Sequence, residues 1–205
     1  MSATDHTARW RQVQFATSVG KPEQLPQGGI EVAFAGRSNA GKSSTLNTLC
    51  DQKGLARTSR TPGRTQLINL FTWSEDARLA DLPGYGYAKA PEAVRKQWAG
   101  LVQRYFVEHS PLKGVVVIMD ARRPLTPLDQ QMVIWALAGH LPVLCLLNKA
   151  DKLSRGAAAA QLQSARRTLA TLDGEVQAEL FSAATGLNLA PVRRHLESWL
   201  SPATA

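Results

Sequence analysis

The chain has 205 residues, of which 44% are hydrophobic, and this is enough for one domain with a proper core but not for two. It contains no run of about 18 uncharged apolar residues and no apolar segment of the secretory type, so we expect a cytoplasmic protein with no membrane association. Its two cysteines, Cys50 and Cys145, lie in apolar segments without a C-x-x-C pairing. This argues against a disulfide framework or a zinc site and favours buried, reduced thiols.

The formal net charge of +8 favours an anionic partner. Arginine outnumbers lysine, and its planar guanidinium both hydrogen-bonds phosphate and stacks on nucleobases. Any single basic pair is more simply a solvated face, so the total charge carries more weight than one residue. Trp10, between Arg9 and Arg11, is a candidate RNA contact.

Apolar strand-like runs alternate with helical ones after a basic lead-in over 1–27, and this predicts an α/β domain over 28–201 and a short tail over 202–205. The expected strands are 30–36, 65–73, 77–84, 114–120, 142–151 and 176–183. The expected helices are 41–50, 91–109, 126–139, 154–172 and 189–200. The short connection between the second and third strands indicates antiparallel pairing. We therefore expect a six-stranded, mostly parallel sheet with helices on both faces and ligands at the carboxyl ends of its strands.

The segment that joins the first predicted strand to the first helix fits the pattern G-x-x-x-x-G-K-[ST]. In this setting the loop amides and the helix N-terminus face phosphate oxygens, Lys42 reaches the β- and γ-phosphates, and the Ser43 hydroxyl ligates Mg²⁺. A glycine-rich turn that matches by chance is the weaker interpretation, because strand and helix are both present. The predicted phosphate-binding residues are Gly36, Arg37, Ser38, Asn39, Ala40, Gly41, Lys42, Ser43 and Ser44.

The base is predicted from Asn148-Lys149-Ala150-Asp151, which has the N-K-x-D form found in GTPases and closes a strand. The Asp151 carboxylate can accept two hydrogen bonds from the ring N–H and the exocyclic amine of guanine, which adenine cannot supply. Adenine would leave that charge buried and unpaired, which costs more than a missing contact. Lys149 is expected to lie along the base, and Asn148 to tie the segment to the base and the phosphate loop. GTP and GDP are the expected ligands.

The D-x-x-G element Asp81-Leu82-Pro83-Gly84 follows the third predicted strand. Asp81 is expected to hold Mg²⁺ through water, and the Gly84 amide to sense the γ-phosphate. A short S-A element near the last strand resembles one whose backbone amide meets the guanine carbonyl oxygen. Its residues are Phe181, Ser182 and Ala183.

A switch segment is expected in TSRTPGRTQ, between the phosphate loop and D-x-x-G. Gly63 and Arg64 are candidate nucleotide contacts. Thr65 is our choice for the threonine that closes on Mg²⁺, and Thr61 is the competitor. With Lys42 and the Gly84 amide, Thr65 makes up the expected catalytic set.

The strings GRSNAGKSS, TPGRTQ, DLPGYGYA, NKAD and FSA, in this order, resemble the EngB family (also called YihA or YsxC) of bacterial ribosome-assembly GTPases, within the translation-factor-related GTPases. The resemblance covers roughly Trp10 to Leu200, including the QFATSV lead-in. It implies a Ras-like P-loop GTPase fold, GTP and Mg²⁺ binding, slow hydrolysis and a role in maturing the large ribosomal subunit. The expected partner is that subunit or its precursor, as RNA and protein, and we expect the chain to act as a monomer.

One departure from the Ras pattern affects hydrolysis. Tyr85 follows Gly84 where Ras-type enzymes carry the glutamine that orients water, so no side chain here is an evident water-positioner. We expect slow hydrolysis until a partner or an ion completes the site. Asn39 offers a site for K⁺ against the phosphates, and the alternative is that Asn39 only rigidifies the loop.

Two other functions stay open from the sequence. One is a GTP-gated interaction protein in cell division, septation or signalling, in which hydrolysis is incidental. The other is an RNA-modification GTPase, although such enzymes generally carry further catalytic domains for which this chain has no room.

Overall fold

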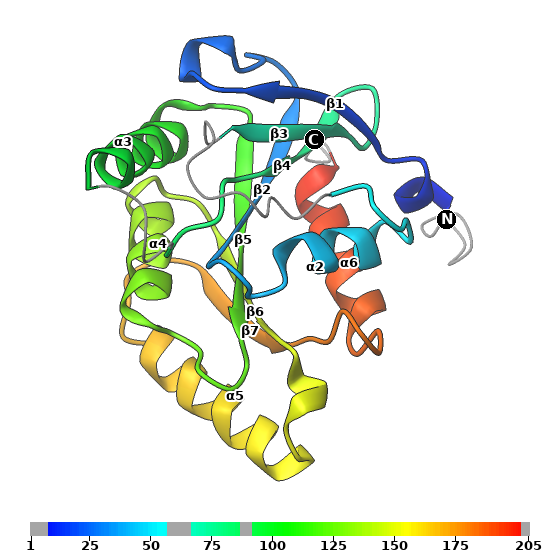
Figure 1. Cartoon of the computed structure of the whole chain (residues 1–205), viewed down its shortest axis with the longest axis vertical. Helices are drawn as coiled ribbons and strands as arrows, with labels where there is room; N and C mark the ends of the chain where they lie inside the picture. The colour runs from blue at the N-terminus through cyan, green and yellow to red at the C-terminus, as the bar shows by residue number, and fades with distance from the viewer. Residues whose placement is uncertain (1–7, 57–66, 87–91, 202–205) are drawn as a thin grey trace.

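The computed structural model describes residues 8–56, 67–86 and 92–201. At its centre is a seven-stranded sheet with the order β1-β3-β4-β2-β5-β6-β7 (Figure 1). The strands are β1 (Gln14–Val19), β2 (Ile30–Gly36), β3 (Ile68–Thr72), β4 (Ala77–Asp81), β5 (Leu112–Asp120), β6 (Val143–Asn148) and β7 (Val176–Leu180). The helices are η1 (Pro22–Gln24), α2 (Lys42–Leu49), α3 (Glu92–Glu108), α4 (Pro127–Ala138), η2 (Ala150–Lys152), α5 (Arg155–Leu169) and α6 (Leu189–Leu200).

Strand pairing confirms a mostly parallel sheet. β4, β2, β5, β6 and β7 pair in parallel, whereas β3 pairs antiparallel with β4, as expected for the second and third predicted strands. The predicted count of six strands is wrong, because QFATSV of the lead-in forms β1 and pairs antiparallel with β3. Five of its six side chains are exposed, so β1 lacks the apolar run that indicates a strand in a sequence.

Helices cover both faces of the sheet, and the core has two parts (Figure 1). On one face Val32 and Phe34 of β2 belong to a cluster with side chains of α2 and α6. On the other face Ala33 and Ala35 belong to a cluster with side chains of α3, α4 and α5. Because successive residues of a strand face opposite sides, a strand buried on both faces reads as the continuous apolar run seen in this chain.

Trp10 is fully buried, which rules out the predicted stacking on RNA. Its indole N–H donates a hydrogen bond of 2.7 Å to Glu197 Oε1 in α6. The Arg9 guanidinium lies over the ring of Trp73, 4.9 Å from its centroid. Trp10, which we expected at the surface, therefore holds the start of the described chain against α6.

Both cysteines are free and buried, as expected. Burial raises the pKa of the Cys50 thiol to about 12, so it stays protonated at neutral pH. Among the helices of the described ranges, none is both long enough and apolar enough to cross a membrane.

Candidate nucleotide-binding site

The predicted phosphate loop connects β2 to α2, so the expected strand, loop and helix are all present. Gly41 has φ +99° immediately before the first helical residue, a region that side chains rarely adopt. A Cβ atom there would collide with Nδ2 of Asn148. Glycine is required at this position by its backbone and by the close approach of the second motif.

Two ionic groups meet at the start of α2. The Lys42 ammonium forms an ion pair with Oδ1 of Asp81, the last residue of β4, and both side chains are almost buried. Ser43 follows Lys42 in the first turn of the helix. A carboxylate and a hydroxyl are oxygen donors of the kind that Mg²⁺ prefers, and one or two such ligands suffice when substrate phosphates complete the coordination. The residues present therefore fit a phosphate-bound Mg²⁺.

Asn148 joins three of the predicted motifs. It is 2% exposed at the end of β6, and its Nδ2 donates to the carbonyl oxygen of Ala40 at 2.9 Å. Its Oδ1 accepts from the amide N–H of Ala183 at 3.1 Å. The amide of Ala183 that we assigned to the base therefore bonds to Asn148 in this structure. One side chain holds the phosphate loop, the N-K-x-D segment and the S-A element together.

Asp151 and Ser182 also meet, a contact that neither motif predicted. The Ser182 hydroxyl donates to Oδ1 of Asp151 at 2.6 Å, and Lys152 Nζ lies 3.3 Å from Oδ2. The Ser182 hydrogen bond is the main reason that the pKa of Asp151 lies below its ordinary value. An ionised carboxylate is the acceptor that two guanine N–H groups require.

Main-chain bonds fix the remaining predicted residues of the base motifs. The amide of Ala150 donates to the carbonyl oxygen of Phe181 at 3.1 Å, and the Phe181 amide donates to Leu147 at 2.9 Å. The Phe181 ring is fully buried in the core cluster that includes side chains of β6 and α6. Ala150 and Phe181 thus fix the spacing between the N-K-x-D and S-A segments through their main chains, and their side chains are buried in the protein.

Lys149 reaches from β6 toward the phosphate loop. Its Nζ donates to the carbonyl oxygen of Asn39 at 2.6 Å and lies 3.1 Å from Oδ2 of Asp120, the last residue of β5. No role was predicted for Asp120, although an acidic residue at the end of a strand beside N-K-x-D was a signal that could have found it.

Main-chain hydrogen bonds from Leu82 and from Tyr85, which follows the D-x-x-G segment, join this part of the chain to β2 and the phosphate loop. Leu82 N–H donates to the Phe34 carbonyl, and Tyr85 N–H donates to that of Gly36. In return, the amide of Ser38 donates to the Tyr85 carbonyl at 2.7 Å. The D-x-x-G segment, residues 81–84, therefore runs from the end of β4 past the start of the phosphate loop.

The Tyr85 side chain is buried, 3% exposed. Its hydroxyl donates to Oδ1 of Asp129 in α4 at 2.8 Å, and its ring contacts Trp98 of α3 at a centroid distance of 5.7 Å. It therefore packs between α3 and α4 and leaves no polar group for a water molecule at the phosphates. The switch residues Thr61, Gly63, Arg64 and Thr65 lie outside the described residues.

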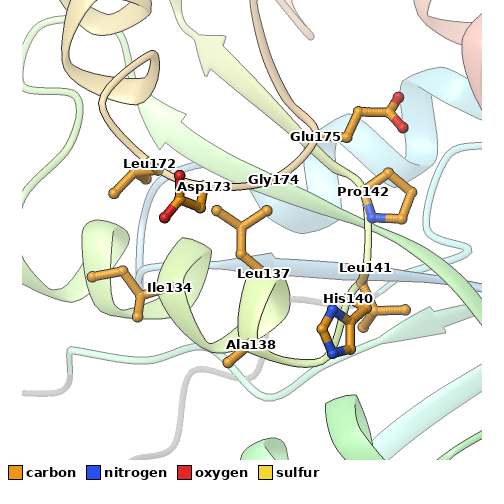
Figure 2. Close-up of a pocket in the computed structure, with 10 residues that line it drawn as sticks. All are labelled: Ile134, Leu137, Ala138, His140, Leu141, Pro142, Leu172, Asp173, Gly174 and Glu175. Atoms are coloured by element: carbon orange, nitrogen blue, oxygen red, sulfur yellow. The ribbon is translucent and has the colours of Figure 1, made fainter.

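A groove of about 630 Å³ lies elsewhere, between the end of α4, the start of β6 and the connection from α5 to β7 (Figure 2). Its walls include Leu137, Leu141 and Leu172, with Asp173 and Glu175 at the connection. None of the predicted site residues that lie within the described ranges lines it. Because it adjoins the amino ends of β6 and β7 and the motifs lie at the carboxyl ends, it is separate from the nucleotide site.

Sequence comparison places the chain in a family. A family model described as 50S ribosome-binding GTPase matches residues 31–149. A probable GTP-binding protein EngB from Photobacterium profundum is 52% identical over 194 residues, which is 94% of this chain and 83% of the relative. The chain belongs to the EngB family. A second EngB relative, from Enterobacter sp. (strain 638), is 53% identical over 191 residues, covering 93% of this chain and 92% of its own.

Solved structures agree on the fold. The crystal structure of a probable GTP-binding protein EngB aligns with a TM-score of 0.66 at 21% identity, covering 83% of this chain and 98% of the other. Era of Aquifex aeolicus, bound to GDP·AlF₄⁻, aligns with a TM-score of 0.64 at 21% identity, covering 86% of this chain and 58% of the other. The predicted P-loop GTPase fold is confirmed, and as an EngB protein the chain binds GTP and GDP and hydrolyses GTP.

Proposed function

We propose that this EngB protein is a nucleotide-switched factor in the assembly of the large ribosomal subunit. The observation that carries the proposal is the match to a family described as 50S ribosome-binding GTPases. The net charge of +8 supports it, since an RNA-rich partner presents phosphates. Two exposed arginines, Arg122 and Arg123, lie just beyond the carboxyl end of β5, at the edge of the sheet where the nucleotide motifs are found. We further propose that the protein acts as a cytoplasmic monomer.

The predicted residues have the following proposed roles at the nucleotide. Residues 36–44 surround the phosphates, and Lys42 neutralises the β- and γ-oxygens once it exchanges Asp81 for phosphate. Ser43, Asp81 and one of Thr65 and Thr61 hold Mg²⁺, whose contribution when bound is to neutralise charge on the phosphate oxygens. The Gly84 amide contacts the γ-phosphate, so the D-x-x-G segment responds to its presence.

The guanine is proposed to lie against the N-K-x-D and S-A segments. Asp151 accepts from the ring N–H and the exocyclic amine, and the Lys149 stem covers one face of the base. Ser182 keeps the Asp151 carboxylate ionised and oriented, with their oxygens 2.6 Å apart. Asn148 aligns the base segment with the phosphate loop through the Ala40 carbonyl.

We propose that hydrolysis is slow until a partner or K⁺ completes the site. Tyr85 supports this because its hydroxyl is committed to Asp129. Asn39 is the proposed K⁺ residue. Its side chain is exposed. Its φ of +66° lies in the left-handed region, which asparagine tolerates better than most residues. The loop conformation by itself could therefore explain why an asparagine occupies this position.

An Asn39→Gly variant separates these two explanations, since glycine adopts the same backbone without the amide. If the amide binds K⁺, the variant keeps its GDP affinity and loses the acceleration of hydrolysis by K⁺ over Na⁺. Acceleration that persists in the variant would mean that Asn39 serves only the loop conformation.

The ribosomal role is tested by cosedimentation with separated subunits, with GDP or a non-hydrolysable GTP analogue, over a salt series. We expect binding to the large subunit in the GTP state that survives moderate salt. Lys42→Ala is the matched control, because it should lose the nucleotide dependence while the basic surface elsewhere remains.

Equal, salt-labile binding to both subunits in either nucleotide state would contradict the proposal, since it would reflect general affinity for RNA. A partner retained after RNase treatment and found in ribosome-free extract would instead favour the GTP-gated interaction protein in cell division or signalling.

A further inference from the structure

We propose that Asp120 is a positioning residue for guanine binding, because it holds the Lys149 ammonium beside the phosphate loop. This inference rests on the proposed role of Lys149 at the base. Asp120 ends β5 and, in the parallel register, lies beside Asn148 at the end of β6. The amide N–H of Ala121 donates to the Asn148 carbonyl at 2.7 Å, which fixes the two strand ends to each other.

Lys149 is held at its backbone and at its tip. Its φ of +64° lies in the left-handed region, uncommon for a residue other than glycine, and this directs the chain from β6 into η2. The ammonium sits between two acceptors, the Asn39 carbonyl at 2.6 Å and Asp120 Oδ2 at 3.1 Å. The stem between these anchors is the part proposed to cover the base.

Arg122 keeps Asp120 charged and oriented. Its guanidinium binds both carboxylate oxygens, with Nε 2.9 Å from Oδ1 and Nη2 2.6 Å from Oδ2. Its backbone N–H donates to Oδ1 at 3.0 Å. These bonds hold the pKa of Asp120 well below its usual range, and the bonds from the Arg122 guanidinium are the largest cause. The carboxylate is therefore a permanent anion shared by Arg122 and Lys149.

Such an arrangement favours nucleotide binding by preorganisation. A lysine side chain has several rotatable bonds, and ordering it only when the base arrives would reduce the affinity. With Asp120 in place, the stem is already close to its proposed bound position. Asp120 should affect nucleotide affinity only through Lys149. Its effect should therefore be the same for two nucleotides that differ only in the exocyclic amine of the base, because Lys149 covers the ring face and not that amine.

A double-mutant cycle on GDP affinity tests this, with titration of a fluorescent GDP analogue into wild type, Asp120→Asn, Lys149→Ala and the double variant. We expect Asp120→Asn to weaken GDP binding about tenfold, within the range of coupling between contacting residues. In the Lys149→Ala background the same change should have no further effect. Asp173→Asn removes an equal charge from an exposed residue of the distant groove and should leave the affinity unchanged.

Arg122→Ala is a second variant, expected to fold because its side chain is 53% exposed. It should weaken GDP binding about threefold, again only when Lys149 is present. IDP, which lacks the exocyclic amine, should show the same factors as GDP. Thermal unfolding of each variant checks that it is folded.

The contrary results differ from one another. If Asp120→Asn weakens GDP binding equally with and without Lys149, Asp120 acts by another route and the inference is wrong. If Lys149→Ala binds GDP as tightly as wild type, the proposed role of Lys149 at the base fails first, and the inference fails with it.

Discussion

The Asn148 side chain donates a hydrogen bond of 2.9 Å to the Ala40 carbonyl oxygen, so the end of β6 is joined directly to the phosphate loop. The other amide atom of Asn148 accepts from Ala183 beyond β7. Three segments that are far apart in the sequence are thus positioned by one buried amide.

Asn148→Ala should destabilise the protein and weaken nucleotide binding together. It leaves the buried Ala40 carbonyl and the part-buried Ala183 amide without their partner, at a cost of about 1 to 3 kcal/mol for each such group that is buried. Urea unfolding without nucleotide and GDP titration measure the two effects. Asn148→Asp keeps an acceptor for Ala183 but sets a carboxylate oxygen against the Ala40 carbonyl oxygen, so it should be no more stable than Asn148→Ala. An unfolding free energy equal to wild type would contradict this account.

Gly41→Ala should be much more damaging than Gly54→Ala, although both glycines have positive φ. A methyl group on Gly54 would enter open space, so its substitution should cost only backbone strain, about 1 kcal/mol. At Gly41 the new methyl group must also displace Asn148, and GDP binding should be lost. Unfolding and GDP titration of the two variants compare them. Equal behaviour would show that the close approach to Asn148 is unimportant.

Tyr85→Phe should reduce stability without changing the intrinsic rate of GTP hydrolysis. It removes a hydrogen bond to the buried carboxylate of Asp129, which is worth about 1.5 to 3 kcal/mol. The hydroxyl faces α4, so single-turnover hydrolysis should match wild type. For the same reason Tyr85→Gln should not accelerate hydrolysis. A faster Gln variant would show that this side chain can reach the phosphates.

Glu31 should make the free energy of unfolding fall more steeply in acid than it does in a Glu31→Gln variant. The carboxylate of Glu31 is fully buried; burial raises its pKa, but bonds with His109, Tyr105 and Arg78 outweigh this and lower it below 4.5 overall. Since the folded-state pKa is lower than the unfolded one, the unfolded chain takes up the proton first. This stabilisation is present above pH 4.5 and is lost as the pH falls through the folded-state pKa.

The measurement is urea unfolding of wild type and Glu31→Gln at several pH values from neutral to about 3. The wild type should lose more stability than the variant across the acid range, although the variant is the less stable at neutral pH. Parallel losses in both proteins would mean that Glu31 is not the group responsible.

Much of the site could be predicted from the sequence because its residues follow buried strands directly. The apolar runs before Gly36, Asp81 and Asn148 place three motifs at strand ends, and carboxyl ends of parallel strands share one edge of a sheet. The strand β1 could not be found in this way. Its side chains are mostly exposed, and its place comes from backbone pairing with β3, which lies much further along the chain.

Short patterns along the chain were enough to identify the nucleotide motifs and to predict the strand and helix that flank the phosphate loop, because periodicity and spacing are properties of neighbouring residues. The contacts that each motif makes became known only from the folded structure. Trp10 was expected at the surface and lies in the core, Tyr85 is committed to Asp129, and Asp120 meets Lys149. Each of these contacts joins residues distant in the chain, so it exists only after the sheet has assembled and its helices have packed.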